Sequence, residues 1–274
     1  MPAQATDLKY LSEMLHNVQQ LRIASENRAR SLYQSGDDHL AYADPVDTLT
    51  ELEKSIAKNM KKELKRFSPA IYKFAKDTPG LGEHLIARLI GEIGNPAIAL
   101  PYHWEGSGST KTLVADPAYH RTVGQLWAYC GHGDPERRSK DKANKGNQDL
   151  LLAAGDPKAK MLVHLIAECT MKSVGGVDKV GHVRPRSPYR DVYDATRLKY
   201  LDATHTTTCV RCGPSGKPAQ PGSPLSDAHK HARALRKVGK EVLRDLWLVA
   251  REELQLSTER EVDYSDRETH LTCV

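Results

Sequence analysis

Apolar residues recur three or four positions apart through most of this chain, which is the spacing of amphipathic α-helices. Strict alternation of apolar and polar residues, the corresponding pattern of half-buried β-strands, is almost absent. The chain has 274 residues, enough to bury a sizeable hydrophobic core. The sequence therefore predicts a mainly α fold.

Two long helical patterns open the chain. The first covers residues 7–33, and the second begins at Asp44-Pro45 after a polar break. Because each pattern carries one apolar stripe, we expect a helical hairpin or coiled coil over residues 1–67 that joins copies of the chain into a homo-oligomer. The second pattern also carries a run of lysines, which is either a solvated face or a face for phosphate groups. The candidate phosphate contacts in this run are Lys61, Lys62 and Lys65.

A tight glycine turn follows in the segment TPGLGEHLIARLIGEIGN, residues 78–95. Pro79 stops one helix, and the two glycines permit positive φ and close approach, which is the pattern of a helix-hairpin-helix over residues 70–95. Free amides at the start of the second helix can donate hydrogen bonds to a phosphate oxygen, so Gly80, Leu81 and Gly82 are candidate nucleic-acid contacts. A plain turn between two helices is the alternative. The glycine fingerprints of dinucleotide and Walker phosphate sites are absent.

Four further helices are expected after the hairpin, with loops between them. The helices are predicted near residues 118–129, from Pro157 onward, over 188–201 and over 226–254. Loops are predicted over residues 100–110, 131–147 and 175–187. Together with the helix-hairpin-helix, these elements make a second helical region over residues 68–256, and a flexible acidic tail over residues 257–274 ends the chain.

A pair of cysteines lies in the Pro-, Gly- and Ser-rich segment before the last helix. Cys209 and Cys212 have the spacing of a zinc knuckle, in which one turn offers two thiolates to one ion. We expect His229 and His231 to complete the site. His205 is the alternative ligand, because two histidines separated by one residue at a helix start do not easily point the same way. A structural Zn²⁺ would join the loop of residues 205–231 to the last helix, whereas a redox or free thiol pair and a chance spacing are the alternatives.

Several motifs follow the glycine turn in a definite order. They are VGQLWAYCGHGDP at 123–135, AGDPKAKMLVHLIAECTMK at 154–172, SPYRDVYDATRLKY at 187–200 and HKHARALRKVGKEVLRDLW at 229–247. With PGLG before them, this series resembles the C-terminal domain of transposases of the insertion sequence 110/116 family, over roughly residues 50–251. The resemblance places residues 128–131 at the family's "AYAG" turn and Trp247 at its aromatic end. It places Gly155, Asp156 and Lys160 at the family's "GN…R" helix.

This resemblance implies a DNA-binding protein related to mobile-element transposases. The family's loop serine corresponds to Ser139, which would be the nucleophile of an active strand-transfer enzyme. The basic residues of the same loop are further candidate nucleic-acid contacts: Arg137, Arg138, Lys140, Lys142 and Lys145. Family members also carry an N-terminal resolvase-like domain whose acidic residues bind divalent metal, and residues 1–67 do not match it. Strand transfer would therefore need acidic residues and Mg²⁺ from a separate resolvase-like partner.

Charge and hydropathy limit the partners further. The formal net charge of +5 suits DNA, and structured RNA has the same backbone chemistry. An oligomeric interaction protein with no nucleic-acid role is the alternative from another class. The N-terminus lacks a secretory pattern, the longest apolar stretch contains His164 and Glu168, and the five cysteines are mostly dispersed. We therefore expect a reduced, cytoplasmic protein with no membrane partner.

Overall fold

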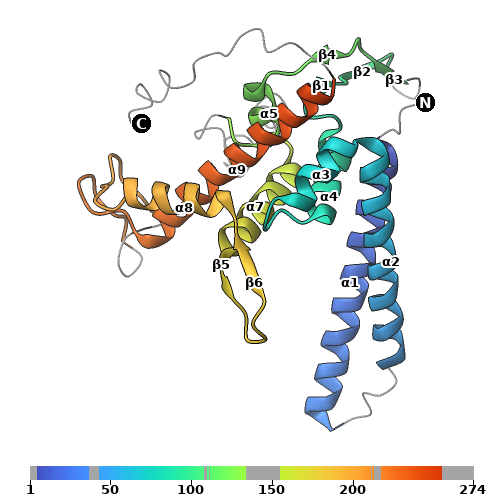
Figure 1. The fold of residues 1–274 in the computed structure, drawn as a ribbon, viewed down its shortest axis with the longest axis horizontal. Helices are drawn as coiled ribbons and strands as arrows, with labels where there is room; N and C mark the ends of the chain where they lie inside the picture. The colour runs from blue at the N-terminus through green and yellow to red at the C-terminus, as the bar shows by residue number, and fades with distance from the viewer. Residues whose placement is uncertain are drawn as a thin grey trace.

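The computed structural model describes residues 5–36, 43–107, 110, 112–133, 155–210, 212 and 217–254. It is mainly helical, as the apolar spacing predicts, and its strands are short. Helix α1 (Ala5–Ser35) and helix α2 (Ala43–Phe67) lie side by side as a long hairpin at one side of the molecule (Figure 1). The predicted N-terminal helical hairpin is confirmed.

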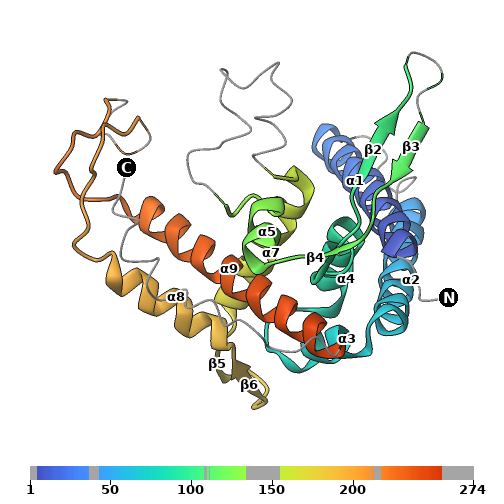
Figure 2. The same ribbon diagram turned by 90° about the horizontal axis from the view of Figure 1, so that it is seen from above.

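The other helices form a body at one end of this hairpin. They are α3 (Pro69–Asp77), α4 (Glu83–Ile93), α5 (Val123–Tyr129), α7 (Pro157–Lys172), α8 (Pro188–Lys199) and α9 (Asp227–Glu253). Figure 2 shows α9 crossing the body, with α8 alongside it and α3 near its C-terminal end. None of the helices in the described ranges has both the length and the apolarity that a membrane crossing requires.

One hydrophobic core joins the hairpin to the body. The side chains of Leu8, Met60 and Leu64 are almost wholly buried in the same cluster as residues of α4, α7 and α9. Farther from the body the apolar stripes emerge into solvent, since Leu21 is 54% exposed and Leu52 is 43% exposed. The half of the hairpin nearest the body is therefore held by the core, and the other half extends beyond it.

Side-chain caps explain where several helices begin. Asp156 accepts a hydrogen bond from the Ala159 N–H (2.7 Å) ahead of Pro157, and Ser226 caps α9 in the same way. Ser68 caps α3, and its hydroxyl also donates to the carboxylate of Glu253 at the end of α9. This last bond ties the start of α3 to the C-terminal end of α9.

Three short antiparallel strand pairs correct the loop predictions. Strand β1 (Ile98–Ala99) pairs with β4 (Tyr119–His120), and β2 (Tyr102–Glu105) pairs with β3 (Thr112–Ala115). Strand β5 (Val174–Val177) pairs with β6 (Val183–Arg186), where the sequence predicts a loop. Strands of two to four residues are too short to show a period of two, and most of their residues are not buried.

The helix predicted to start near residue 118 begins later, at Val123. Thr122 and Gln125 form a capping box that sets this start, with the Gln125 side chain accepting from the Thr122 N–H (2.8 Å). The preceding residues, Tyr119 and His120, are paired with β1 instead. The Thr-x-x-Gln signal was present in the sequence and would have given the correct boundary.

Candidate metal centre and glycine-turn surface

Backbone hydrogen bonds fold the segment before α9 back on itself. The Leu225 N–H donates to the Ala203 carbonyl (2.9 Å), and the His205 N–H donates to the Ser223 carbonyl (2.8 Å). Cys209 and Ala219 exchange two backbone bonds of 2.8 and 2.9 Å. This pairing brings the part of the segment that carries His205 and Cys209 over the start of α9.

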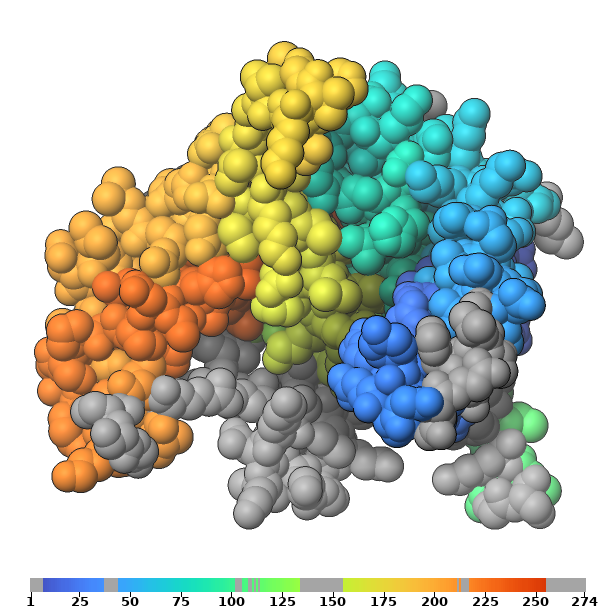
Figure 3. All heavy atoms as spheres, turned by 90° about the horizontal axis from the view of Figure 1, so that it is seen from below, coloured from blue at the N-terminus to red at the C-terminus, as the bar shows by residue number. Residues whose placement is uncertain are grey.

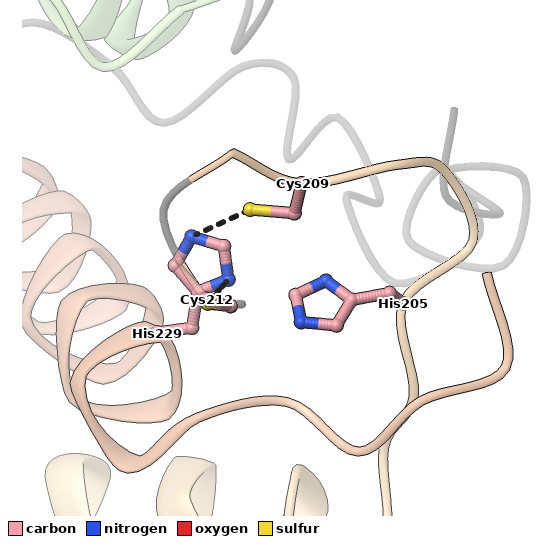
Figure 4. Close-up of side chains that lie close together, drawn as sticks. All are labelled: His205, Cys209, Cys212 and His229. Carbon is pink, nitrogen blue, oxygen red and sulfur yellow. Dashed lines mark hydrogen bonds between the residues drawn. The ribbon is translucent and has the colours of Figure 1, made fainter. Parts of the chain in front are cut away.

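Four side chains converge there, as Figure 4 shows. They are His205, Cys209, Cys212 and His229, and their ligand atoms all lie within 4.8 Å of one another. The Cys212 Sγ is 3.2 Å from Nδ1 of His229, and the Cys209 Sγ is 4.0 Å from Nε2 of the same ring. The His205 and His229 ring centroids are 5.4 Å apart. This cluster can hold a metal ion.

The environment of two of these groups favours metal binding. His205 is buried, and no described residue is a hydrogen-bond partner for its Nε2. Burial raises the pKa of the Cys212 thiol, but hydrogen bonds from Ser226 outweigh it, and the net pKa lies below the ordinary value. A metal ion would give the buried imidazole nitrogen the partner that it lacks and would take the Cys212 sulfur as thiolate.

The positions of these side chains distinguish between His205 and His231 as the second histidine ligand. His205 belongs to the cluster with Cys209, Cys212 and His229, and His231 lies outside it. The Nδ1 of His231 is instead 2.7 Å from the hydroxyl of Tyr193 on α8. His229 and His231 are two residues apart on a helix, so their side chains leave the axis about 200° apart and cannot reach one ion together. The expectation of His231 as a ligand is wrong for this reason.

The glycine turn forms as predicted, but its two glycines have different surroundings. Gly80 (φ +86°) is packed against the end of α7, where an added Cβ would lie 2.6 Å from the Ser173 Oγ and 2.8 Å from the Thr170 Cα. Leu81 is wholly buried and its N–H donates to the Thr78 carbonyl (3.2 Å), so neither its side chain nor its amide is free for a ligand. Gly82 (φ +68°) is the N-cap of α4 and has only His84 near its Cβ position, at 3.9 Å.

The N-terminus of α4 has no side-chain cap, because Gly82 has no side chain to provide one. The first amides of this helix therefore have no carbonyl partner within the helix, and the Glu83 N–H donates instead to its own carboxylate. The Glu83 carboxylate lies at this position, with its Oε2 3.4 Å from Nζ of Lys61 on α2. Burial raises the pKa of Glu83, but its own backbone N–H and Lys61 outweigh this, so the pKa is lowered. The site thus favours negative charge.

The Lys61–Glu83 contact brings the lysine-rich side of α2 to the start of α4. Lys58, Lys62 and Lys65 are exposed and follow one another at helical spacing, which places them on one face. Among the described residues, no carboxylate pairs with Lys58 or Lys62, and the Lys65 Nζ is 6.0 Å from the ring centroid of Tyr72. Two of the predicted contacts, Lys62 and Lys65, are thus available for a ligand, whereas Lys61 already has a partner.

The remaining predicted site residues lie outside the described ranges. They are Ser139, Arg137, Arg138, Lys140, Lys142 and Lys145. The sequence reasoning missed Glu83, although an acidic residue directly after Gly82 in a helix's first turn is a recognised start signal.

Comparisons of the chain with protein-family models, with curated proteins and with solved structures find no match. The chemistry of the metal centre and of the glycine-turn surface therefore carries the functional inference.

Proposed function

We propose that this protein binds DNA through its sugar–phosphate backbone, as a relative of mobile-element transposases. The main support is the uncapped N-terminus of α4, which lies beside the lysine face of α2. Backbone N–H groups and the helix dipole favour a phosphate there, and lysines add charge along the same surface. Such contacts position a duplex without reading its sequence. Strand transfer by Ser139 stays a prediction, because that residue lies outside the described ranges.

The binding experiment compares two triple variants that remove the same charge. Changing Lys58, Lys62 and Lys65 to Gln is expected to weaken binding of a duplex DNA and to flatten its salt dependence, because each phosphate contact contributes about 0.9 to the slope of log K against log salt. Fluorescence anisotropy between low and physiological salt measures both quantities. The triple variant should lose about 2 to 3 from the slope if all three lysines contact phosphates.

The control triple changes Arg28, Arg30 and Lys199 to Gln. These side chains are exposed, and they lie at the far part of α1 and at the end of α8. We expect this control to bind DNA nearly as the unaltered protein does. Equal losses in both triples would contradict a surface centred on α2 and α4, and undetectable binding of the unaltered protein at low salt would overturn the proposed function.

Glu83→Gln is expected to strengthen DNA binding. The substitution removes a negative charge from the proposed phosphate position and releases Lys61, which now lies 3.4 Å from that carboxylate. One unit charge at about 4 Å in water is worth about 1 kcal/mol, or about fivefold in affinity. The helix should lose about 0.3–1 kcal/mol of stability, because an acidic side chain favours a helix N-terminus.

The matched control for this variant is Glu51→Gln. Glu51 is an exposed acidic residue of the same helix as Lys61, and it pairs with Lys54 at 2.7 Å. Anisotropy titrations should show a clear gain for Glu83→Gln and a smaller one for Glu51→Gln. Weaker binding by Glu83→Gln would show that the carboxylate supports the interaction and does not compete with phosphate.

We also propose that zinc is the ion of the metal centre. Two thiolates and two imidazoles are the usual ligands of structural zinc, and four protein ligands leave no open position for catalysis. Tetrahedral zinc with normal bond lengths holds its ligand atoms roughly 3.3–3.8 Å apart. The four donors lie within 4.8 Å of one another, so only a small contraction is needed. Bound zinc would join the segment before α9 to the start of that helix.

A further inference from the structure

The β5–β6 hairpin projects from the body as an arm (Figure 1). Its strands and turn carry four exposed valines: Val174, Val177, Val180 and Val183, of which the last two are 78% and 80% exposed. Val177 and Val183 are paired directly across the two strands and share one face, with Val180 in the turn beyond them, and this apolar surface has no partner in the described part of the chain. Basic side chains accompany them, namely Lys172, Lys179 and Arg184.

The root of the arm is firmly attached to the helices. The Ser187 N–H donates to the Ser173 carbonyl across the root (2.9 Å). Arg186 donates to the carboxylates of Asp191 and Asp194 on α8, both at 2.7 Å. Arg190 donates to the Met171 carbonyl at the end of α7 (3.0 Å). The direction in which the arm leaves the body is therefore set by contacts with two helices.

The turn of the arm is also held in one shape, by Asp178. Its carboxylate accepts hydrogen bonds from the N–H groups of His182 (2.9 Å) and Val180 (3.0 Å), which lower its pKa. Arg184 lies 3.4 Å from the same carboxylate. Because Asp178 is used inside the turn, by backbone N–H groups and by Arg184, the surface of the arm presents the valines and Lys179.

The arm stands next to the proposed DNA-binding surface. An open cleft of about 740 Å³ lies between the arm and the glycine turn, and Pro79, Gly80 and Lys172 are among its lining residues. The space-filling view in Figure 3 shows the arm beside the segment of α3 and α4. A duplex whose backbone lies at the start of α4 would therefore have the arm within reach of its groove.

We propose that the β5–β6 arm enters the major groove of the DNA duplex, an inference that rests on the proposed function. A two-stranded β-ribbon fits the major groove of B-form DNA, which is about 12 Å wide. Lys179 would contact the phosphates on a groove edge, and the exposed valines would contact thymine methyl groups and base edges. The major groove of A-form RNA is too deep and narrow for side chains to read. The arm thus makes B-form DNA the preferred ligand over double-stranded RNA.

The test uses an arm variant in which Val177, Val180 and Val183 become Ser, with the full chain otherwise unchanged. The unaltered protein is expected to bind a DNA duplex about tenfold more tightly than an RNA duplex of matched sequence, and to protect guanine N7 in the major groove from methylation. The arm variant should lose most of this preference and the N7 protection. Its backbone footprint by hydroxyl radicals should remain, because the start of α4 and the lysines of α2 are intact.

The control variant changes Leu198 and Lys199, an exposed apolar and an exposed basic residue at the end of α8, to Ser and Gln. It should keep both the DNA preference and the N7 protection. Unchanged N7 reactivity in the complex, or full DNA preference in the arm variant, would overturn the role of the arm while leaving backbone binding intact. If the unaltered protein binds neither duplex, the proposed function fails as well.

Discussion

Cys212→Ser is expected to abolish stable metal binding and to loosen the segment between α8 and α9. Structural zinc contributes about 10–16 kcal/mol in small zinc modules, so one of four ligands accounts for roughly 3–4 kcal/mol. In this protein Cys212 also lies 3.0 Å from the hydroxyl of Ser226, the cap of α9, so its loss should reach the start of that helix. The unaltered protein should contain one zinc ion per chain by mass spectrometry and should melt at a lower temperature after chelation.

Two matched variants test whether removing a cysteine or a histidine outside the metal centre would also release the metal. Cys169→Ser removes an exposed free cysteine on α7, and His231→Asn removes the histidine beside His229 that lies outside the cluster. Both should keep the metal, whereas His205→Asn should lose it. Loss of metal in His231→Asn and its retention in His205→Asn would contradict the ligand set. A protein whose melting temperature is unaffected by chelation would contradict a structural metal.

Gly80→Ala is expected to destabilise the fold by about 2–5 kcal/mol. An added Cβ would lie 2.8 Å from the Thr170 Cα, and backbone of α7 cannot move away as a side-chain end can. Overpacking of this kind costs about 1–3 kcal/mol, and a non-glycine residue at positive φ costs about 1–2 kcal/mol more. Chemical denaturation followed by circular dichroism measures the difference in the free energy of unfolding.

Gly82→Ala is the internal comparison for this prediction. Its φ is also positive, but its Cβ position is open except for His84, so only the backbone strain of about 1–3 kcal/mol is expected. Comparing Gly80→Ala with Gly82→Ala therefore separates the contribution of the turn to the stability of the fold from its contribution to DNA binding. Gly82→Ala should weaken DNA binding more than it weakens the fold, because the new methyl group lies at the start of α4. Equal stability losses in the two variants would contradict the contact of Gly80 with α7.

Local signals were sufficient for most helices. Pro157 after Asp156, and Ser226 ahead of the apolar stripe of α9, set helix starts through bonds within one turn of the chain. The start of α5 was also encoded locally, in the capping box of Thr122 and Gln125, whereas the strand pairs depend on partner strands. Tyr119 and His120 belong to a strand only because β1 lies beside them.

The candidate metal centre likewise has features that a local pattern predicts and features that depend on contacts between distant segments. The spacing of Cys209 and Cys212 is a local property, and it identified the centre from the sequence alone. The choice of His205 over His231 depends on how the backbone between Ala203 and Leu225 pairs with itself, and on the contact of His231 with Tyr193 of α8. The helical spacing of His229 and His231 already disfavours both as ligands of one ion, but these distant contacts determine that His205 is the histidine that joins the cluster.

By itself, the sequence determined the mainly helical fold, the N-terminal hairpin, the glycine turn and the cysteine pair, because each follows from spacings within a few residues. Only the tertiary structure decided which other parts of the chain those features contact. Gly80 meets the end of α7, Glu83 meets Lys61 at the start of α4, and the β5–β6 arm lies across a cleft from the turn. Contacts between segments far apart in the chain depend on the packing of the whole core, which is why local patterns do not contain them.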